Sequence, residues 1–128
     1  MSPIANMLVQ IKNAQGRGLA EVALPFSKMK FAIAGILLKE GYLAGVDEQK
    51  KKGKKSELPY LHLKLKDNAI NGVRLISKPS RRMYAHADEL KKVKSGYGIS
   101  VVSTPQGIMS GKMAHKAGVG GEVLFEIW

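Results

Sequence analysis

Residues 96–109 read GYGISVVSTPQGIM, an apolar stretch of β type followed at once by a turn. Ile99, Val101 and Val102 favour a strand, because β-branched side chains fit a pleated, half-buried surface. Pro105 and Gly107 are then expected to end the strand and force a turn. The turn therefore offers short, rigidly placed hydrogen-bonding groups, on Ser103, Thr104 and Gln106.

The charge of the chain indicates what such groups would contact. Lys and Arg outnumber Asp and Glu by 21 to 10 over 128 residues, which gives a net charge of +11. This excess predicts attraction to a polyanion, such as RNA, DNA or an anionic membrane surface. We therefore expect the hydroxyl turn to meet a nucleic-acid sugar, base edge or phosphate.

Other features disfavour a membrane protein. The longest apolar run, residues 31–38, contains Gly35 and falls short of the ~20 residues that a membrane span requires. The N-terminus has no signal-peptide pattern. The chain has no cysteine, which excludes disulfides and thiolate metal sites and is compatible with a cytoplasmic location.

The order of predicted elements indicates an α+β fold of two small domains. Residues 1–77 read as an N-terminal αβαβββ domain of a sheet plus helices. One helix should begin at the cap Ser2, and a second should run from the cap Ser27 to Gly41. The second helix should be mostly buried, because its main apolar stripe is widened on both sides. The main stripe consists of Met29, Ile33, Ile36 and Leu37, and the residues that widen it are Phe31, Ala34 and Leu38. The expected strands of this domain are residues 22–24, 42–46, 60–65 and 73–76.

Residues 78–128 read as a C-terminal, mainly β domain. Half of the 14 glycines lie between Gly96 and Gly121, so the composition changes beyond residue 77. Short helical segments are expected around residues 88–93 and 112–117, and a final strand at residues 122–127. We expect this domain to bind RNA.

No arrangement of residues indicates catalysis. The histidines, His62, His86 and His115, lack the spacing of a helical metal pair. Ser103 lies in no nucleophile-elbow pattern, which would place a glycine two residues away on each side. The chain is therefore expected to be no enzyme, with no cofactor and no metal.

Two basic segments are candidates for phosphate contact. Lys28 and Lys30 occupy the first turn of a helix, where two ammonium groups and free N–H groups could hold one phosphate. The alternative is that both side chains extend into water.

The second segment, residues 78–84, combines three cations with Tyr84, which could stack on a base or ribose. Its alternative is a solvated edge strand with Met83 packed inside. The lysine-rich residues 48–56 are expected to form a solvated loop. For Ser103 and Thr104, the alternative is that their hydroxyls bond their own backbone.

The segment GYGISVVSTPQGIMSGKMAHKAGVGGEVL, residues 96–124, resembles the C-terminal signature of bacterial ribosomal protein eight of the small subunit. Residues 4–14 (IANMLVQIKNA), 27–42 (SKMKFAIAGILLKEGY) and 78–84 (KPSRRMY) resemble other segments of that family, in the same order. The resemblance covers nearly the whole chain apart from the lysine-rich segment.

The resemblance implies a two-domain protein that binds directly to the central domain of 16S ribosomal RNA and acts early in platform assembly. It implies neighbouring small-subunit ribosomal proteins as further partners and, in some bacteria, the messenger RNA of the protein's own operon. In such a protein, the Ser-Thr turn of the C-terminal domain would enter the minor groove of an irregular RNA helix. That role falls on Ser103 and Thr104, with Gln106 nearby.

Other residues take roles around this turn. The resemblance implies that Tyr84 faces the RNA and that Glu122 accepts from a base amino group or a 2′-OH. Pro105 departs from the family pattern and removes a side-chain hydrogen bond. We expect the cations to supply electrostatic anchoring: Lys28, Lys30, Lys78, Arg81, Arg82, Lys112 and Lys116.

Three other functions are alternatives to this interpretation. The first is a translational regulator or RNA chaperone that acts off the ribosome. The second is an RNA-modifying enzyme, for which the sequence offers no catalytic residues. The third is a DNA-architectural protein.

Overall fold

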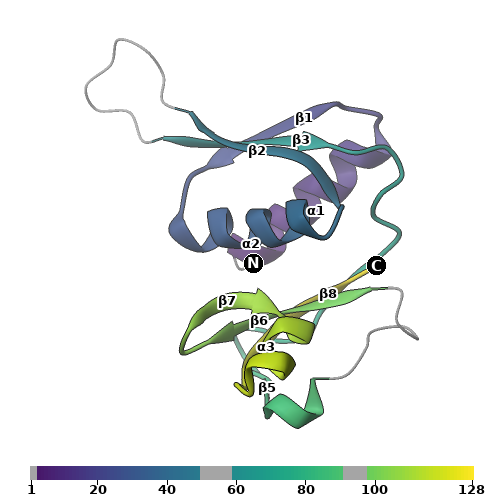
Figure 1. Ribbon diagram of the computed structural model, residues 1–128. Coiled ribbons are helices and arrows are strands. Elements are labelled where there is room, and N and C mark those ends of the chain that lie inside the picture. Colours follow the sequence, from purple (N-terminus) through teal and green to yellow (C-terminus); the bar gives the residue numbers. More distant parts are fainter. Residues whose placement is uncertain (1–2, 50–58, 91–97) are drawn as a thin grey trace. The chain divides into compact units, whose positions relative to one another are not determined.

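The computed structural model describes residues 3–49, 59–90 and 98–128. It divides into two compact units, Pro3–Ala69 and Ile70–Trp128, called here the N-terminal and C-terminal units. Each unit combines helices with an antiparallel sheet (Figure 1), so the predicted α+β class is confirmed.

The N-terminal unit is a three-stranded sheet with two helices on one face (Figure 1). Its elements are α1 (Pro3–Gly16), β1 (Glu21–Pro25), α2 (Lys28–Lys39), β2 (Leu43–Gln49) and β3 (Tyr60–Leu65). The strand order is β1-β3-β2, with both pairings antiparallel. Leu61 and Leu63 of β3 are fully buried, whereas His62 and Lys64 alternate with them on the opposite face.

The ends of α2 follow the sequence signals. Ser27 Oγ accepts a hydrogen bond from the Lys30 N–H at 3.1 Å, as expected of an N-cap. Gly41 adopts φ +87°, its N–H donates to the Leu38 carbonyl, and the Tyr42 N–H donates to the Leu37 carbonyl. These two bonds form a Schellman motif, which confirms Gly41 as the helix-ending residue.

The burial of α2 is narrower than expected. Only Ile33, Ala34 and Leu37 are buried in this helix. Three apolar side chains that the sequence analysis placed in the stripe are exposed by 39–44%: Met29, Phe31 and Leu38. The prediction of a mostly buried helix is therefore wrong, because a helix on one face of a sheet buries a single stripe.

The C-terminal unit is an antiparallel sheet with α3 (Gly111–Ala117) on one face. Its strands are β4 (Val73–Leu75), β5 (Tyr84–Ala85), β6 (Ile99–Thr104), β7 (Gly107–Ser110) and β8 (Gly121–Ile127). The order is β4-β8-β6-β7, and β5 pairs with β8 beside β4. Ala114 of α3 packs against Val102 and Leu90, and Met109 and Val123 cover this cluster.

The expected place of β4 in the first domain is wrong. Val73 pairs with Ile127 and Leu75 with Phe125, so β4 belongs to the sheet of the C-terminal unit. The division between the units falls between Ala69 and Ile70 instead of after residue 77. A local pattern could not show this, because the partner of β4 lies at the other end of the chain.

The short helices are close to their expected positions. Residues Ala87–Glu89 form a 3-10 helix, η1, and His115 Nδ1 of α3 lies 2.7 Å from the Ala87 carbonyl oxygen. Three expectations fall at least partly outside the described residues: the Ser2 cap, most of the lysine-rich segment and the end of the helix expected at 88–93.

Candidate nucleic-acid interface

Three of the predicted site residues form a row across the sheet of the C-terminal unit. Tyr84 of β5 lies opposite Glu122 of β8, and Glu122 lies opposite Ser103 of β6. Residues that are directly opposite in an antiparallel ladder point to the same face. We call Tyr84, Glu122 and Ser103 the polar row. It lies on the face away from α3, because the neighbouring Val102 packs against Ala114.

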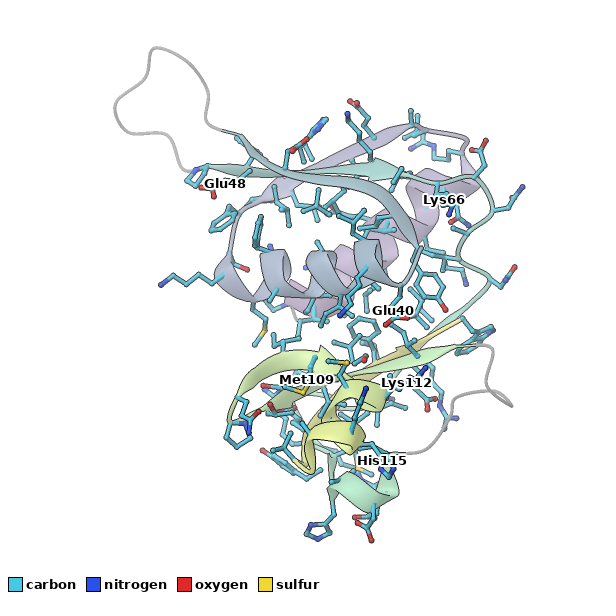
Figure 2. The ribbon with its side chains drawn as sticks, viewed as in Figure 1. Glu40, Glu48, Lys66, Met109, Lys112 and His115 are labelled. Atoms are coloured by element: carbon cyan, nitrogen blue, oxygen red, sulfur yellow. The ribbon has the colours of Figure 1, made fainter. Side chains whose placement is uncertain are left out.

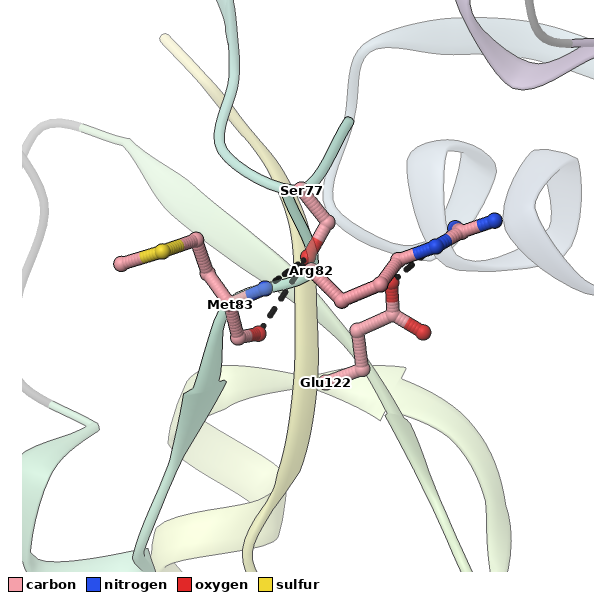
Figure 3. A network of polar contacts seen from close by, with 4 residues as sticks. All are labelled: Ser77, Arg82, Met83 and Glu122. Atoms are coloured by element: carbon pink, nitrogen blue, oxygen red, sulfur yellow. Dashed lines mark hydrogen bonds and ion pairs between the residues drawn. The ribbon is translucent and has the colours of Figure 1, made fainter. Parts of the chain in front are cut away.

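The polar row presents an aromatic ring beside a paired carboxylate. Tyr84 is 71% exposed. Arg82 Nη1 donates to Glu122 Oε2 at 3.2 Å, and the two side chains are 54% and 18% exposed (Figure 3). The Arg82 guanidinium, which the sequence analysis assigned to phosphates, therefore neutralises the one acidic member of the row.

The Thr104 hydroxyl forms hydrogen bonds within its own turn. Thr104 is only 9% exposed, and its Oγ1 donates to the Gly107 carbonyl at 2.7 Å. The same oxygen accepts from the Gln106 N–H at 3.1 Å. The expectation of an exposed Thr104 hydroxyl is therefore wrong, since the local alternative holds for this residue. The side chain of Gln106 stays exposed at the turn.

Gly107 does not end the ladder. It pairs with Thr104 and begins β7, with φ +118°, so Pro105 and Gln106 alone connect the two strands. β7 was not predicted from sequence, because this strand is half-exposed and short. Ser103 consequently lies within a paired strand, opposite Ile108, instead of in a free loop.

Two glycines bring the three strands of the polar row close together. A Cβ atom at Gly121 would meet the Ser103 carbonyl oxygen and would lie 3.1 Å from Thr104 Cα. A Cβ atom at Gly120 would meet the Ala85 carbonyl oxygen. The start of β8 therefore fits between β5 and β6 only because these residues lack side chains.

The loop before β5, residues 77–83, is a turn closed by hydrogen bonds and is called here the basic turn. Lys78 and Arg81 exchange both backbone hydrogen bonds, each at 2.9 Å. Ser77 Oγ accepts from the Met83 N–H at 2.8 Å and donates to the Met83 carbonyl at 3.2 Å (Figure 3). The side chains of Lys78 and Arg81 are exposed, and Met83 is 37% exposed instead of packed inside.

The remaining predicted cations lie elsewhere. Lys28 is exposed, whereas Lys30 is half-buried and its Nζ donates to the Pro25 carbonyl at 3.4 Å. Lys112 and Lys116 are exposed on α3, whose packing puts them on the sheet face opposite the polar row (Figure 2 labels Lys112). The structure therefore does not bring Lys112 and Lys116 together with the polar row.

Arg74 was not among the site residues predicted from sequence. This exposed residue of β4 lines a pocket together with Lys78 and Arg81. No local signal marked it, because β4 was assigned to the other domain. The pairing of β4 with β8 is what joins Arg74 to the basic turn.

Neither a metal-binding cluster nor a membrane-spanning helix occurs among the described residues. No group of three or more His, Asp or Glu side chains there could hold a metal ion. No helix of that part of the chain is long and apolar enough to cross a membrane. His62 pairs with Glu21 at 3.1 Å and His115 with a backbone carbonyl, so these two histidines have separate partners.

A family model described as ribosomal protein S8 matches residues 2–128. The chain belongs to the ribosomal protein S8 family. The resemblance found in the sequence is thereby confirmed over nearly its full length.

Individual members of the S8 family are similar along their whole length. The small ribosomal subunit protein uS8 of Thermoanaerobacter sp. (strain X514) is 47% identical over 127 residues, covering 98% of this chain and 96% of the relative. The uS8 protein of Caldicellulosiruptor bescii is 47% identical over 131 residues, covering 100% and 98%. Because members of this family are structural ribosomal proteins, the prediction that the chain is no enzyme is confirmed.

Proposed function

We propose that the chain is a structural constituent of the small subunit of the cytoplasmic ribosome. In this proposal it binds directly to the central domain of 16S ribosomal RNA and helps to assemble the platform beside other small-subunit proteins. The observation that carries the proposal is the polar row, which aligns an exposed ring, a carboxylate and a hydroxyl on one sheet face. An operon messenger RNA with a similar irregular helix would use the same row.

The polar row is suited to reading the shallow minor groove of an RNA helix. That groove displays 2′-hydroxyls and base edges, and irregular helices expose unstacked bases. Ser103 and Glu122 supply a hydroxyl and an acceptor, and Tyr84 supplies a stacking surface. Gln106 reaches the same RNA from the turn. Thr104 acts through the turn that it holds, as a positioning residue.

Arg82 accounts for the presence of the Glu122 carboxylate in an otherwise cationic interface. In this account its guanidinium holds Glu122 in the orientation that faces the RNA and offsets repulsion between the carboxylate and phosphates. The other cations contact backbone phosphates and add affinity without sequence information. They are Lys28, Lys30, Lys78, Arg81, Lys112 and Lys116.

Chemical footprinting on 16S RNA tests the proposal. The protein should protect one irregular helix of the central domain, and the protection should survive competition by an unbroken duplex. Protection spread evenly over helical regions would contradict direct readout. Sucrose-gradient fractionation at high salt distinguishes the alternative of an RNA chaperone, because only a structural constituent remains with the small subunit.

A further inference from the structure

The basic turn is fixed at both ends to one point of β8. The N–H groups of Ile76 and Ser77 donate to the Leu124 carbonyl, at 3.1 and 3.3 Å. The Val123 N–H donates to the Met83 carbonyl at 2.9 Å. The segment between β4 and β5 therefore stops bonding to β8 at Leu124 and resumes at the adjacent residue, Val123.

An irregularity of the sheet lies at this point. Val101 pairs with Phe125 and Val102 with Val123, so Leu124 has no partner on β6. Such bulges bend a strand and redirect the segments that pair with it. The loop between β4 and β5 therefore begins and ends beside this bulge, and the two hydrogen bonds between Ser77 and Met83 close it.

A pocket of about 280 Å³ lies between this turn and the edge of the sheet. Three of its lining residues are cations, and the other three are apolar: Arg74, Lys78, Arg81, Leu75, Ile76 and Met83. None of the described residues that line it is acidic; Glu126 lies opposite Arg74 in the β4–β8 ladder but forms no ion pair with it. Within the described residues, no ion pair forms to Arg74, Lys78 or Arg81, whereas Arg82 is paired with Glu122.

An anion would offset the charge of this arrangement. Like charges repel, and the repulsion among these three exposed side chains is reduced, but not removed, by water and salt. A phosphate can accept hydrogen bonds from several donors at once, and guanidinium groups match its geometry with two parallel bonds. We propose that Arg74, Lys78 and Arg81 together hold one backbone phosphate of the bound RNA. This inference rests on the proposed function and adds Arg74 to the interface.

The dependence of RNA affinity on salt counts the phosphates involved. Each phosphate contact contributes ~0.7–0.9 to the slope of log affinity against log salt concentration. The triple variant Arg74→Gln, Lys78→Gln, Arg81→Gln should therefore lose ~0.7–0.9 of slope and bind about five- to eightfold more weakly at 0.1 M salt. A loss of ~2.1–2.7 would mean three separate phosphates and would overturn the proposal. An unchanged slope would overturn it too.

Ethylation interference locates the phosphate. With the wild-type protein, ethylation of one particular phosphate of the RNA should weaken binding through this pocket. With the triple variant, and also with Arg74→Gln alone, ethylation at that position should have a smaller effect while the other positions keep theirs. An interference pattern identical for wild type and triple variant would contradict a seated phosphate.

One control variant and the RNA preference of the wild-type protein separate this inference from the proposed function. Arg17→Gln removes an exposed cation of the N-terminal unit and should leave the interference pattern unchanged. If wild-type protein binds the 16S fragment specifically but the pocket variants behave like wild type, the pocket fails and the proposed function stands. If wild-type protein shows no preference for that RNA, the proposed function itself fails.

Discussion

The polar row of the C-terminal unit and the basic start of α2 in the N-terminal unit present polar groups in opposite ways. In the polar row, side chains from three strands are fixed by backbone pairing between residues far apart in sequence. At the start of α2, Lys28 extends from a single helical turn, and Lys30 bonds to a carbonyl five residues away.

This difference separates specificity from attraction. Groups held by a sheet register keep their spacing and can match one arrangement of RNA groups. Flexible lysines can follow any phosphate backbone, and so they raise affinity for all RNAs alike. The two regions should therefore respond differently to mutation.

Gly121→Ala should have the largest effect. The new methyl group would collide with the backbone of β6 at Ser103 and Thr104, which cannot move as a side-chain end could. We expect the free energy of unfolding to fall by ~1–3 kcal/mol, the cost of overpacking, together with loss of specific RNA binding. Urea denaturation and RNA titration measure the two effects.

Gly35→Ala is the matched control in α2. Apart from its chain neighbours and the backbone of its own helix, a Cβ atom there would meet no described heavy atom within 4 Å. Alanine stabilises a helix interior relative to glycine by ~0.5–1 kcal/mol. The same substitution should therefore stabilise one region and destabilise the other. Equal effects at the two glycines would contradict the close approach of β6 and β8.

Thr104→Val and Ser103→Ala should distinguish the stabilising role of Thr104 in the turn from the RNA-binding role of Ser103 in the polar row. Removing the Thr104 hydroxyl abolishes two hydrogen bonds of the hairpin turn and should lower the free energy of unfolding by ~1–2 kcal/mol. Ser103→Ala should change it by less than ~0.5 kcal/mol while weakening binding to the 16S fragment. The reverse pattern in thermal denaturation and RNA titration would assign the exposed hydroxyl to Thr104.

Local features of the fold were predictable from sequence, and long-range features were not. The caps of α2 at Ser27 and Gly41, the alternation along β3 and the closing strand β8 follow from residues adjacent in the chain. The partner of β4 could not be inferred, because residues 73–75 pair with residues 125–127 and such long-range pairing leaves no local pattern. Ser103 and Tyr84 were singled out from the local sequence, whereas Glu122 was anticipated only through family resemblance.

The pairing of charges also lay beyond the sequence. Arg82 and Glu122 are 40 residues apart, and only the register of β5 against β8 brings them together. Charge alone therefore grouped Arg82 with Lys78 and Arg81, although the structure gives it a different partner. Conversely, Arg74 was overlooked because its neighbours in space are not its neighbours in the chain.

The lysines of α2 should give the smallest effects. Lys28→Gln should reduce the salt slope of RNA binding by ~0.7–0.9 without altering the preference between RNAs. Lys30→Gln should reduce it less, because the Lys30 ammonium already contacts the Pro25 carbonyl. Lys12→Gln, an exposed cation on α1, serves as the control and should leave the slope as it is. If Lys28→Gln changed the preference between RNAs, α2 would contribute to the recognition of specific RNA and the prediction would be contradicted.

The most direct test of the central claim is the ratio of two affinities, for the 16S central-domain fragment and for an unbroken RNA duplex of equal length. It should be measured at one salt concentration for wild type and for the triple variant Tyr84→Ala, Ser103→Ala, Glu122→Gln. If the polar row reads the RNA, the ratio falls at least about tenfold while duplex affinity stays within about twofold. Equal losses on both RNAs would contradict the claim and reduce the row to a further source of general affinity.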